Sequence, residues 1–142
     1  MSLNIQELVK THFYHPALNC AVFDGPLRIY FNQSQESLAL KVYFFLQKEV
    51  EKILKQYDGT WYFVVLLYPD VAIYREKLLD HREEISNDLE LPFVSRTFGA
   101  DKLILTHAYS AEVDTQQLSE GLQRELTYLI KTHSHQQYAY VV

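Results

Sequence analysis

The sequence predicts a mixed α/β (α+β) fold, with a central β-sheet of about five strands and helices packed on its faces. Runs of alternating apolar residues indicate strands, and longer runs with apolar residues three and four positions apart indicate helices. The two kinds of run follow one another without a linker or an internal repeat. One run, residues 61–68, is apolar or aromatic at every position, as expected of a strand that is covered on both faces of a sheet.

The composition is that of one folded domain spanning residues 1–142. Hydrophobic residues make up 48% of the chain and charged residues 22%, which excludes the composition typical of disordered proteins. The single cysteine, Cys20, excludes an intramolecular disulfide and a cysteine-based zinc site within one chain. No apolar run approaches the ~20 residues of a membrane helix, and the first residues do not resemble a leader peptide. We therefore expect a cytoplasmic protein that does not contact a membrane.

The first part of the chain predicts a helix followed by a hairpin. Asn4 is placed to cap a helix that ends before Pro16. Residues 18–23 and 27–31 then alternate as strands do, and Asp-Gly-Pro at 24–26 supplies the residues of a tight turn between them.

A long helix is predicted from Gln35 to Tyr57, with Gly59 as its stop signal. Its expected buried face consists of residues at helical spacing, namely Leu38, Val42, Phe45, Leu46, Val50, Ile53, Leu54 and Tyr57. Because the next strand, 61–68, follows this helix, we expect a parallel crossover and hence a mixed sheet.

The second part predicts a helix from Asp70, for which a short extended segment at 71–74 is the alternative, then a hairpin and a final helix. Residues 93–98 and 102–109 form the expected hairpin. Asp114 has the position of a cap for the last helix. The tail, 137–142, alternates apolar and aromatic residues and is predicted to add an edge strand.

Several classes of chemistry are not expected. The net charge is −5 and the basic residues are scattered, whereas nucleic-acid binding needs clustered positive charge. The four glycines are isolated, so no glycine-rich phosphate loop exists. Two histidine pairs have a spacing that is a weak ligand signature, namely His12 with His15 and His133 with His135. We therefore expect neither a metal nor a cofactor.

The leading hypothesis is a non-catalytic regulatory or protein-interaction domain that forms a homodimer. The chain contains eleven Tyr, eight Phe and one Trp, and exposed aromatic residues are enriched in protein interfaces. Tyr138 and Tyr140 lie on the predicted edge strand, where an unpaired edge could extend the sheet across a dimer. These two residues are the predicted interface.

The alternative is a small-molecule-binding domain or an enzyme with a pocket near Arg96, Asp101, His107 and Tyr109. These residues lie on or beside the second predicted hairpin, and their side chains are of types that bind polar ligands or transfer protons. Burial of Arg96 or His107 would favour the pocket, whereas exposure of both would favour the interaction hypothesis.

The order of a hairpin, a long helix, a buried strand and a second helix resembles that of the small domains that antagonise anti-sigma factors. The segment 23–27, Phe-Asp-Gly-Pro-Leu, resembles the early strand turn of some of them. Their phosphorylatable Asp-Ser-x-Gly segment is absent, since 68–71 reads Tyr-Pro-Asp-Val, so the resemblance concerns the fold alone. An equally good architectural match is the roadblock-like and profilin-like arrangement, in which an antiparallel sheet lies between helices.

Overall fold

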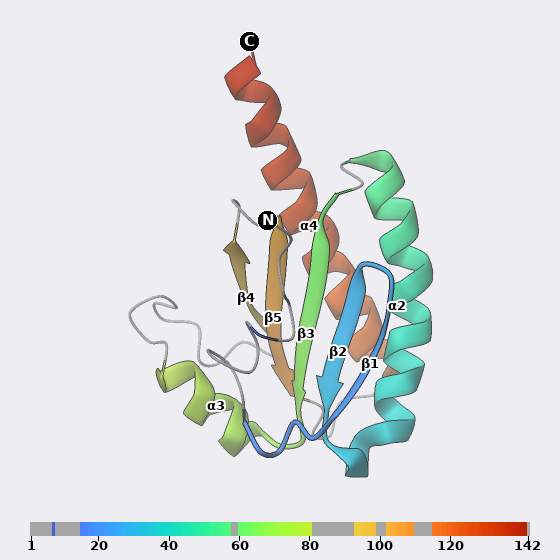
Figure 1. Cartoon of the computed structure of the whole chain (residues 1–142), viewed down its shortest axis with the longest axis vertical. Coiled ribbons are helices and arrows are strands. Elements are labelled where there is room, and N and C mark those ends of the chain that lie inside the picture. Colours follow the sequence, from blue (N-terminus) through green and yellow to red (C-terminus); the bar gives the residue numbers. More distant parts are fainter. Residues whose placement is uncertain are drawn as a thin grey trace.

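The computed structural model describes residues 7, 15–57, 60–80, 93–98, 102–109 and 115–141, although not the side chains of 79–80 and 133–141. Five strands form one mixed sheet with helices packed against both of its faces (Figure 1), so the predicted fold class is confirmed. Most of the predicted first helix, the turn that contains Asp101 and the cap Asp114 lie outside the described residues.

The first two strands form the predicted hairpin. β1 (Cys20–Asp24) pairs antiparallel with β2 (Leu27–Phe31), and the pair Asp24–Leu27 closes a two-residue loop. Gly25 has a φ of 71°, which fits the first central position of a type II′ turn, where glycine is favoured. Pro26 supplies the negative φ that the second position needs. The Asp-Gly-Pro turn thus sets the register of the hairpin.

A short 3₁₀ turn, η2 (Gln33–Gln35), leads into the long helix α2 (Glu36–Gln56). β3 (Tyr62–Tyr68) then runs parallel to β2, so the predicted parallel crossover is confirmed. The predicted buried face of α2 was wrong at one position, because Phe45 is 36% exposed whereas its near neighbour Tyr43 is buried.

The helix α3 (Val71–Asp80) begins as predicted after Asp70, whose side chain accepts a hydrogen bond from the N–H of Ile73 at 2.9 Å. The second predicted hairpin is also present, because β4 (Phe93–Phe98) pairs antiparallel with β5 (Leu103–Tyr109). β5 runs parallel to β3, which gives the strand order β1-β2-β3-β5-β4. The alternative of a wholly antiparallel sheet is therefore wrong, since β2, β3 and β5 are parallel.

The last helix, α4 (Thr115–Val141), includes most of the tail that the sequence predicts as an edge strand, so that prediction is wrong. No Gly or Pro follows Gly121 in the sequence, and the chain therefore contains no strong signal that would end the helix earlier. Figure 1 shows α4 running past the end of the sheet. Among the described helices, none combines the length and the apolar character needed to cross a membrane.

Two hydrophobic cores lie on opposite faces of the sheet. The first lies between the sheet and the helices α2 and α4, and the second between the sheet and α3. β3 contributes alternate residues to each core. Those facing the first are Phe63, Val65 and Leu67, and those facing the second are Val64, Leu66 and Tyr68. β3 is therefore covered on both faces, as its uninterrupted apolar sequence predicts.

Candidate functional site

Two residues of the predicted pocket join an aromatic cluster beside α3. His107 is fully buried, and its Nδ1 lies 3.1 Å from the Tyr68 hydroxyl. The two rings are nearly parallel, with centroids 6.0 Å apart. Tyr109 packs against Tyr74 of α3, with ring centroids 4.8 Å apart. Because a buried polar group is stable only when it is hydrogen-bonded, the Tyr68 contact accounts for the burial of the Nδ1 side of the His107 ring.

Arg96, a third residue of the predicted pocket, is oriented away from this cluster. It is partly buried on β4, and its guanidinium carbon lies 5.1 Å from the centre of the Phe98 ring. Phe98 pairs with the start of β5, whereas His107 pairs with Val94 near the other end of β4. Asp101 lies outside the described residues, so the structure brings His107, and not Arg96, to the buried cluster.

Tyr138 and Tyr140, the predicted interface, lie in the last turns of α4, where side chains are not described. Residues two positions apart share one face of a strand but not one face of a helix. The edge strand that would carry a dimer contact through these tyrosines is therefore replaced by helix.

A strand edge lies instead at β1. β1 is the terminal strand of the sheet, with β2 on its inner side and no strand of the described residues on its outer side. Residues of an antiparallel pair exchange hydrogen bonds alternately. Counting from the closing pair Asp24–Leu27, the N–H and C=O groups of Ala21 and Phe23 point to the outer edge. β1 has no Pro and no charged residue before Asp24, although these are the usual features that keep strand edges from pairing.

An exposed phenylalanine flanks this edge on the face of the sheet that also carries α3. The Phe23 side chain is 56% exposed, and the Arg28 guanidinium lies 4.0 Å from the centre of its ring. Arg28 also donates a hydrogen bond from Nη1 to the Tyr30 hydroxyl at 3.0 Å. The cation–π contact and this hydrogen bond hold the guanidinium against the aromatic side chains.

A second exposed phenylalanine lies on α2, a helix that packs on the opposite face of the sheet. Phe44 of α2 is 59% exposed and makes an edge-on contact with the Tyr43 ring, with centroids 5.8 Å apart. The Tyr43 hydroxyl donates a hydrogen bond to the backbone oxygen of Asp24 at 3.3 Å, which ties this side of α2 to the end of β1. Partial burial, and then the Asp24 charge, raise the pKa of Tyr43, so the hydroxyl stays protonated.

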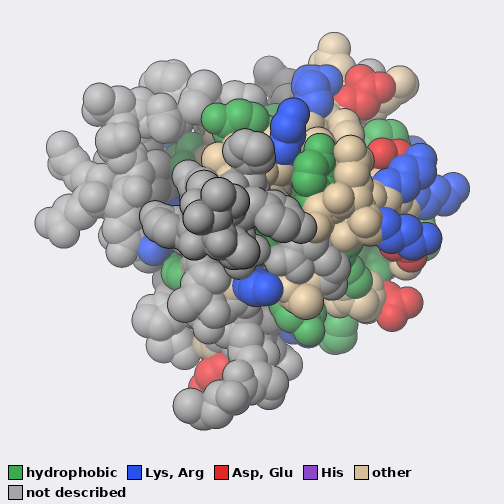
Figure 2. Space-filling model, turned by 90° about the horizontal axis from the view of Figure 1, so that it is seen from above, with side chains coloured by type: hydrophobic (Ala, Val, Ile, Leu, Met, Phe, Trp, Pro, Cys, Tyr) green, Lys and Arg blue, Asp and Glu red, His purple; other side chains and the backbone are tan. Residues whose placement is uncertain are grey.

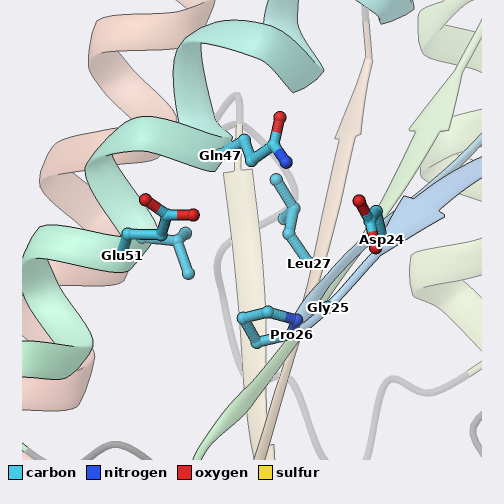
Figure 3. Close-up of a pocket in the computed structure, with 7 residues that line it drawn as sticks. Asp24, Gly25, Pro26, Leu27, Gln47 and Glu51 are labelled. Atoms are coloured by element: carbon cyan, nitrogen blue, oxygen red, sulfur yellow. The ribbon is translucent and has the colours of Figure 1, made fainter.

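We call the backbone of β1, together with the side chains of Ala21, Phe23, Arg28 and Phe44, the β1 edge surface. Next to it, a shallow hollow of about 130 Å³ lies between the hairpin turn and α2. Figure 3 shows Gln47 and Glu51 on the helix and Asp24 on the hairpin, on either side of this hollow. The hollow is too small for a drug-sized ligand, for which pockets of ~300 Å³ or more are usual.

Charged residues mark the limit of this apolar surface on α2. Four exposed lysines recur at spacings of seven, four and three, namely Lys41, Lys48, Lys52 and Lys55. Figure 2 shows Lys and Arg side chains gathered at the side of the molecule where α2 lies. One of them, Lys52, forms an ion pair with Glu49 at 3.5 Å. This outer stripe of α2 is suited to water, and Phe44 lies at its border, since Lys41 and Lys48 are three and four positions away from it on the helix.

Neither a metal centre nor a relative identifies the function. Within the part of the chain that the structure describes, no group of three or more His, Cys, Asp or Glu side chains could hold a metal ion. Comparison with known protein families, curated proteins and solved structures finds no match to this chain. The function therefore has to be argued from the β1 edge surface and the aromatic cluster.

The β1 edge surface was not predicted from the sequence. The sequence did contain a signal for the part of this surface that lies on β1. Ala21 and Phe23 alternate with Cys20 and Val22, which pack on the core, so they lie on the other face of the strand. Helical spacing assigned the next residue, Phe45, to the buried face of the helix and gave no indication of a role for Phe44.

Proposed function

We propose that this chain is a non-catalytic regulatory or protein-interaction domain, and that the β1 edge surface receives its partner. The observation that carries the proposal is that the β1 edge combines outward-facing backbone groups with the exposed Phe23 beside them, while a second exposed phenylalanine, Phe44, lies on the helix that packs on the opposite face. A strand added to an exposed edge gains affinity from main-chain hydrogen bonds and specificity from the side chains beside them.

The side chains of the β1 edge surface are of the kinds that dominate protein interfaces. Aromatic residues and arginine are enriched at the centres of interfaces, where their burial supplies most of the binding energy. Phe23, Arg28 and Phe44 together provide two large apolar groups and one cation whose apolar stem can also be covered. Arg28 already stacks on Phe23, so part of the cost of ordering these side chains is met before binding.

Site-specific crosslinking in cells that express the chain tests this proposal. Phe23 and Phe44 are each replaced by a photoreactive phenylalanine analogue, and Tyr128 of α4, which is 66% exposed, serves as the matched control. We expect a discrete crosslinked protein from positions 23 and 44 but not from 128. Equal crosslinking at all three positions, or none at 23 and 44, would contradict the proposal.

A ligand site at the carboxyl ends of β3 and β5 is the second candidate, and the burial of His107 favours it. The helix that follows β3 covers one face of the sheet, and the helix that follows β5 covers the other. In open α/β sheets ligands bind where the connections change face in this way. Inorganic phosphate or nucleotides should then raise the unfolding temperature of the wild-type chain more than that of Tyr109→Phe, which alters the last residue of β5, and the absence of any shift counts against this candidate.

A further inference from the structure

We infer that the partner at the β1 edge surface is a second copy of this chain, whose β1 pairs antiparallel with this β1 across a two-fold axis at Val22. The inference rests on the proposed function and names the partner. A two-fold contact of this kind uses the same patch on both subunits, so the patch must be complementary to itself. Pairing at β1 would join the two five-stranded sheets into one continuous sheet.

The sequence of β1 is suited to antiparallel pairing with a second copy of itself. With the axis at Val22, all five residues of the strand find an opposite residue. Val22 faces the partner's Val22, Ala21 faces the partner's Phe23, and Cys20 faces the partner's Asp24. This register pairs two β-branched residues at the centre, sets small side chains against large ones and opposes no like charges. An axis at Ala21 or at Phe23 would leave residues of β1 without an opposite strand residue.

The backbone agrees with this register. The residues whose N–H and C=O groups point to the outer edge are Ala21 and Phe23, and these are the residues that the register sets opposite each other. Opposed residues of this kind exchange two hydrogen bonds in an antiparallel ladder. Each subunit would thus satisfy the outward groups of the other.

The side chains on the two faces would close over the new strand pair. On the face of Arg28, the two Phe23 rings become diagonal neighbours, a separation that aromatic side chains can bridge, with Ala21 leaving room between them. On the other face, Phe44 lies one helical turn before Gln47, which borders the hairpin turn, so it is the exposed apolar residue of α2 that an added strand would approach. The two phenylalanines are the most exposed apolar residues near β1, at 56% and 59%, so their burial would contribute most of the hydrophobic gain.

The opposite edge of the sheet is less suited to such pairing. β4 carries Arg96 in its middle, and a charged residue within an edge strand disfavours the approach of a second strand. β1 carries its single charge at its last residue, Asp24. The absence of a charge within the strand therefore favours β1 over β4 as the contact edge.

The solution mass of the purified full chain, measured by light scattering over a dilution series, tests the inference. We expect the wild type to have twice the mass of one chain. Ala21→Lys places a charge in the strand edge at an exposed position and should give a monomer. Phe44→Ser should weaken the dimer at least about tenfold, as expected for truncating an interface aromatic in each subunit. Tyr128→Ser, at a similarly exposed aromatic on α4, should leave the dimer unchanged.

A cysteine scan fixes the register. In a Cys20→Ser background, Val22→Cys should form a disulfide-linked dimer under mild oxidation, because the register makes Val22 a non-hydrogen-bonded pair, whose Cα atoms lie about 4.5 Å apart, within the span of a disulfide. Tyr128→Cys in the same background should not. Unfolding temperatures of all variants, measured alongside, show that each chain is folded.

The outcomes separate this inference from the proposed function. A wild-type chain that is monomeric at every concentration overturns the inference, as does a dimer that Ala21→Lys and Phe44→Ser both leave intact. If the crosslinked species at positions 23 and 44 contains a different protein and the pure chain is monomeric, the inference fails and the proposed function stands. If those positions crosslink to nothing, both fail.

Discussion

At the scale of single residues, the contact between Tyr68 and His107 is a buried polar pair in the core beside α3. The Tyr68 hydroxyl lies 3.1 Å from the His107 ring nitrogen. Tyr68→Phe removes the hydroxyl and leaves the ring, so we expect the free energy of unfolding to fall by about 1–2 kcal/mol. Denaturant unfolding measures this loss.

The control for this change is Tyr62→Phe. Tyr62 lies at the start of the same strand and is 42% exposed, so removing its hydroxyl should change stability by less than about 0.5 kcal/mol. Equal effects of the two substitutions would show that the Tyr68 hydroxyl makes no special contribution to the core.

Glu125 of α4 is a second residue whose environment has a measurable consequence. Partial burial raises its pKa above the ordinary value of 4.5, because burial disfavours the charged form. Because the pKa of Glu125 is higher in the folded than in the unfolded chain, its contribution to the free energy of unfolding is most favourable below pH 4.5. This contribution is lost as the pH rises through the folded-state pKa. Glu125→Gln should therefore increase stability at neutral pH and bring no gain below pH 4.5.

Thermal unfolding at several pH values tests this prediction. Glu76→Gln, at an exposed position on α3, is the matched control and should give a smaller change because the carboxylate stays in water. A gain from Glu125→Gln that does not depend on pH would contradict the assigned cause.

At the scale of secondary-structure elements, the packing of α4 on β4 depends on Gly121. A Cβ added at this position would lie 2.7 and 2.8 Å from two ring carbons of Phe93. Alanine favours a helix by about 1 kcal/mol over glycine, but overpacking costs about 1–3 kcal/mol. We expect Gly121→Ala to lower stability, and a second substitution, Phe93→Leu, to turn the same change into a gain.

A double-mutant cycle measures the coupling between the two positions. If Gly121→Ala stabilises the chain while Phe93 is present, the Phe93 ring moves aside at little cost, and the prediction is wrong. The position of the Phe93 ring against this turn of α4 explains why a glycine stands within the helix.

Most elements could be predicted from the sequence because their signals are local. The turn at Gly25, the apolar run of β3 and the Asp70 cap each act within a few residues. The tail was mispredicted because its alternation extends over only six residues, whereas the helix before it continues without a breaking residue. Helix formation is cooperative, so extending an existing helix is easier than starting a new element.

The candidate site was less predictable than the fold because it depends on contacts between distant segments. The position of Phe44 beside β1 follows from how α2 lies on the sheet, where Tyr43 reaches Asp24 nineteen residues away in the chain. Similarly, the apolar alternation of β1 did not indicate that this strand would be the last in the sheet. Strand order is set by long-range pairing, which periodicity does not report.

At the scale of the whole molecule, the two edges of the sheet and the outer face of α2 differ in character. The lysine stripe of α2 and the Arg96 edge at β4 carry charge, whereas the side chains of the β1 edge surface are apolar apart from Arg28. Raising the salt concentration should therefore leave the dimer intact, because apolar contacts and backbone hydrogen bonds, rather than ion pairs, hold it together. A dimer that dissociates in high salt would contradict this account of the interface.

Hydrogen exchange of the β1 amides at low and high protein concentration tests the central claim most directly. The amides of Ala21 and Phe23 point to the outer edge, so they should exchange quickly in the dilute chain and become protected as the concentration rises. The amides of β3, which pair within the sheet on both sides, should show the same protection throughout. If the amides of Ala21 and Phe23 exchange equally fast at every concentration, β1 does not pair with a second copy.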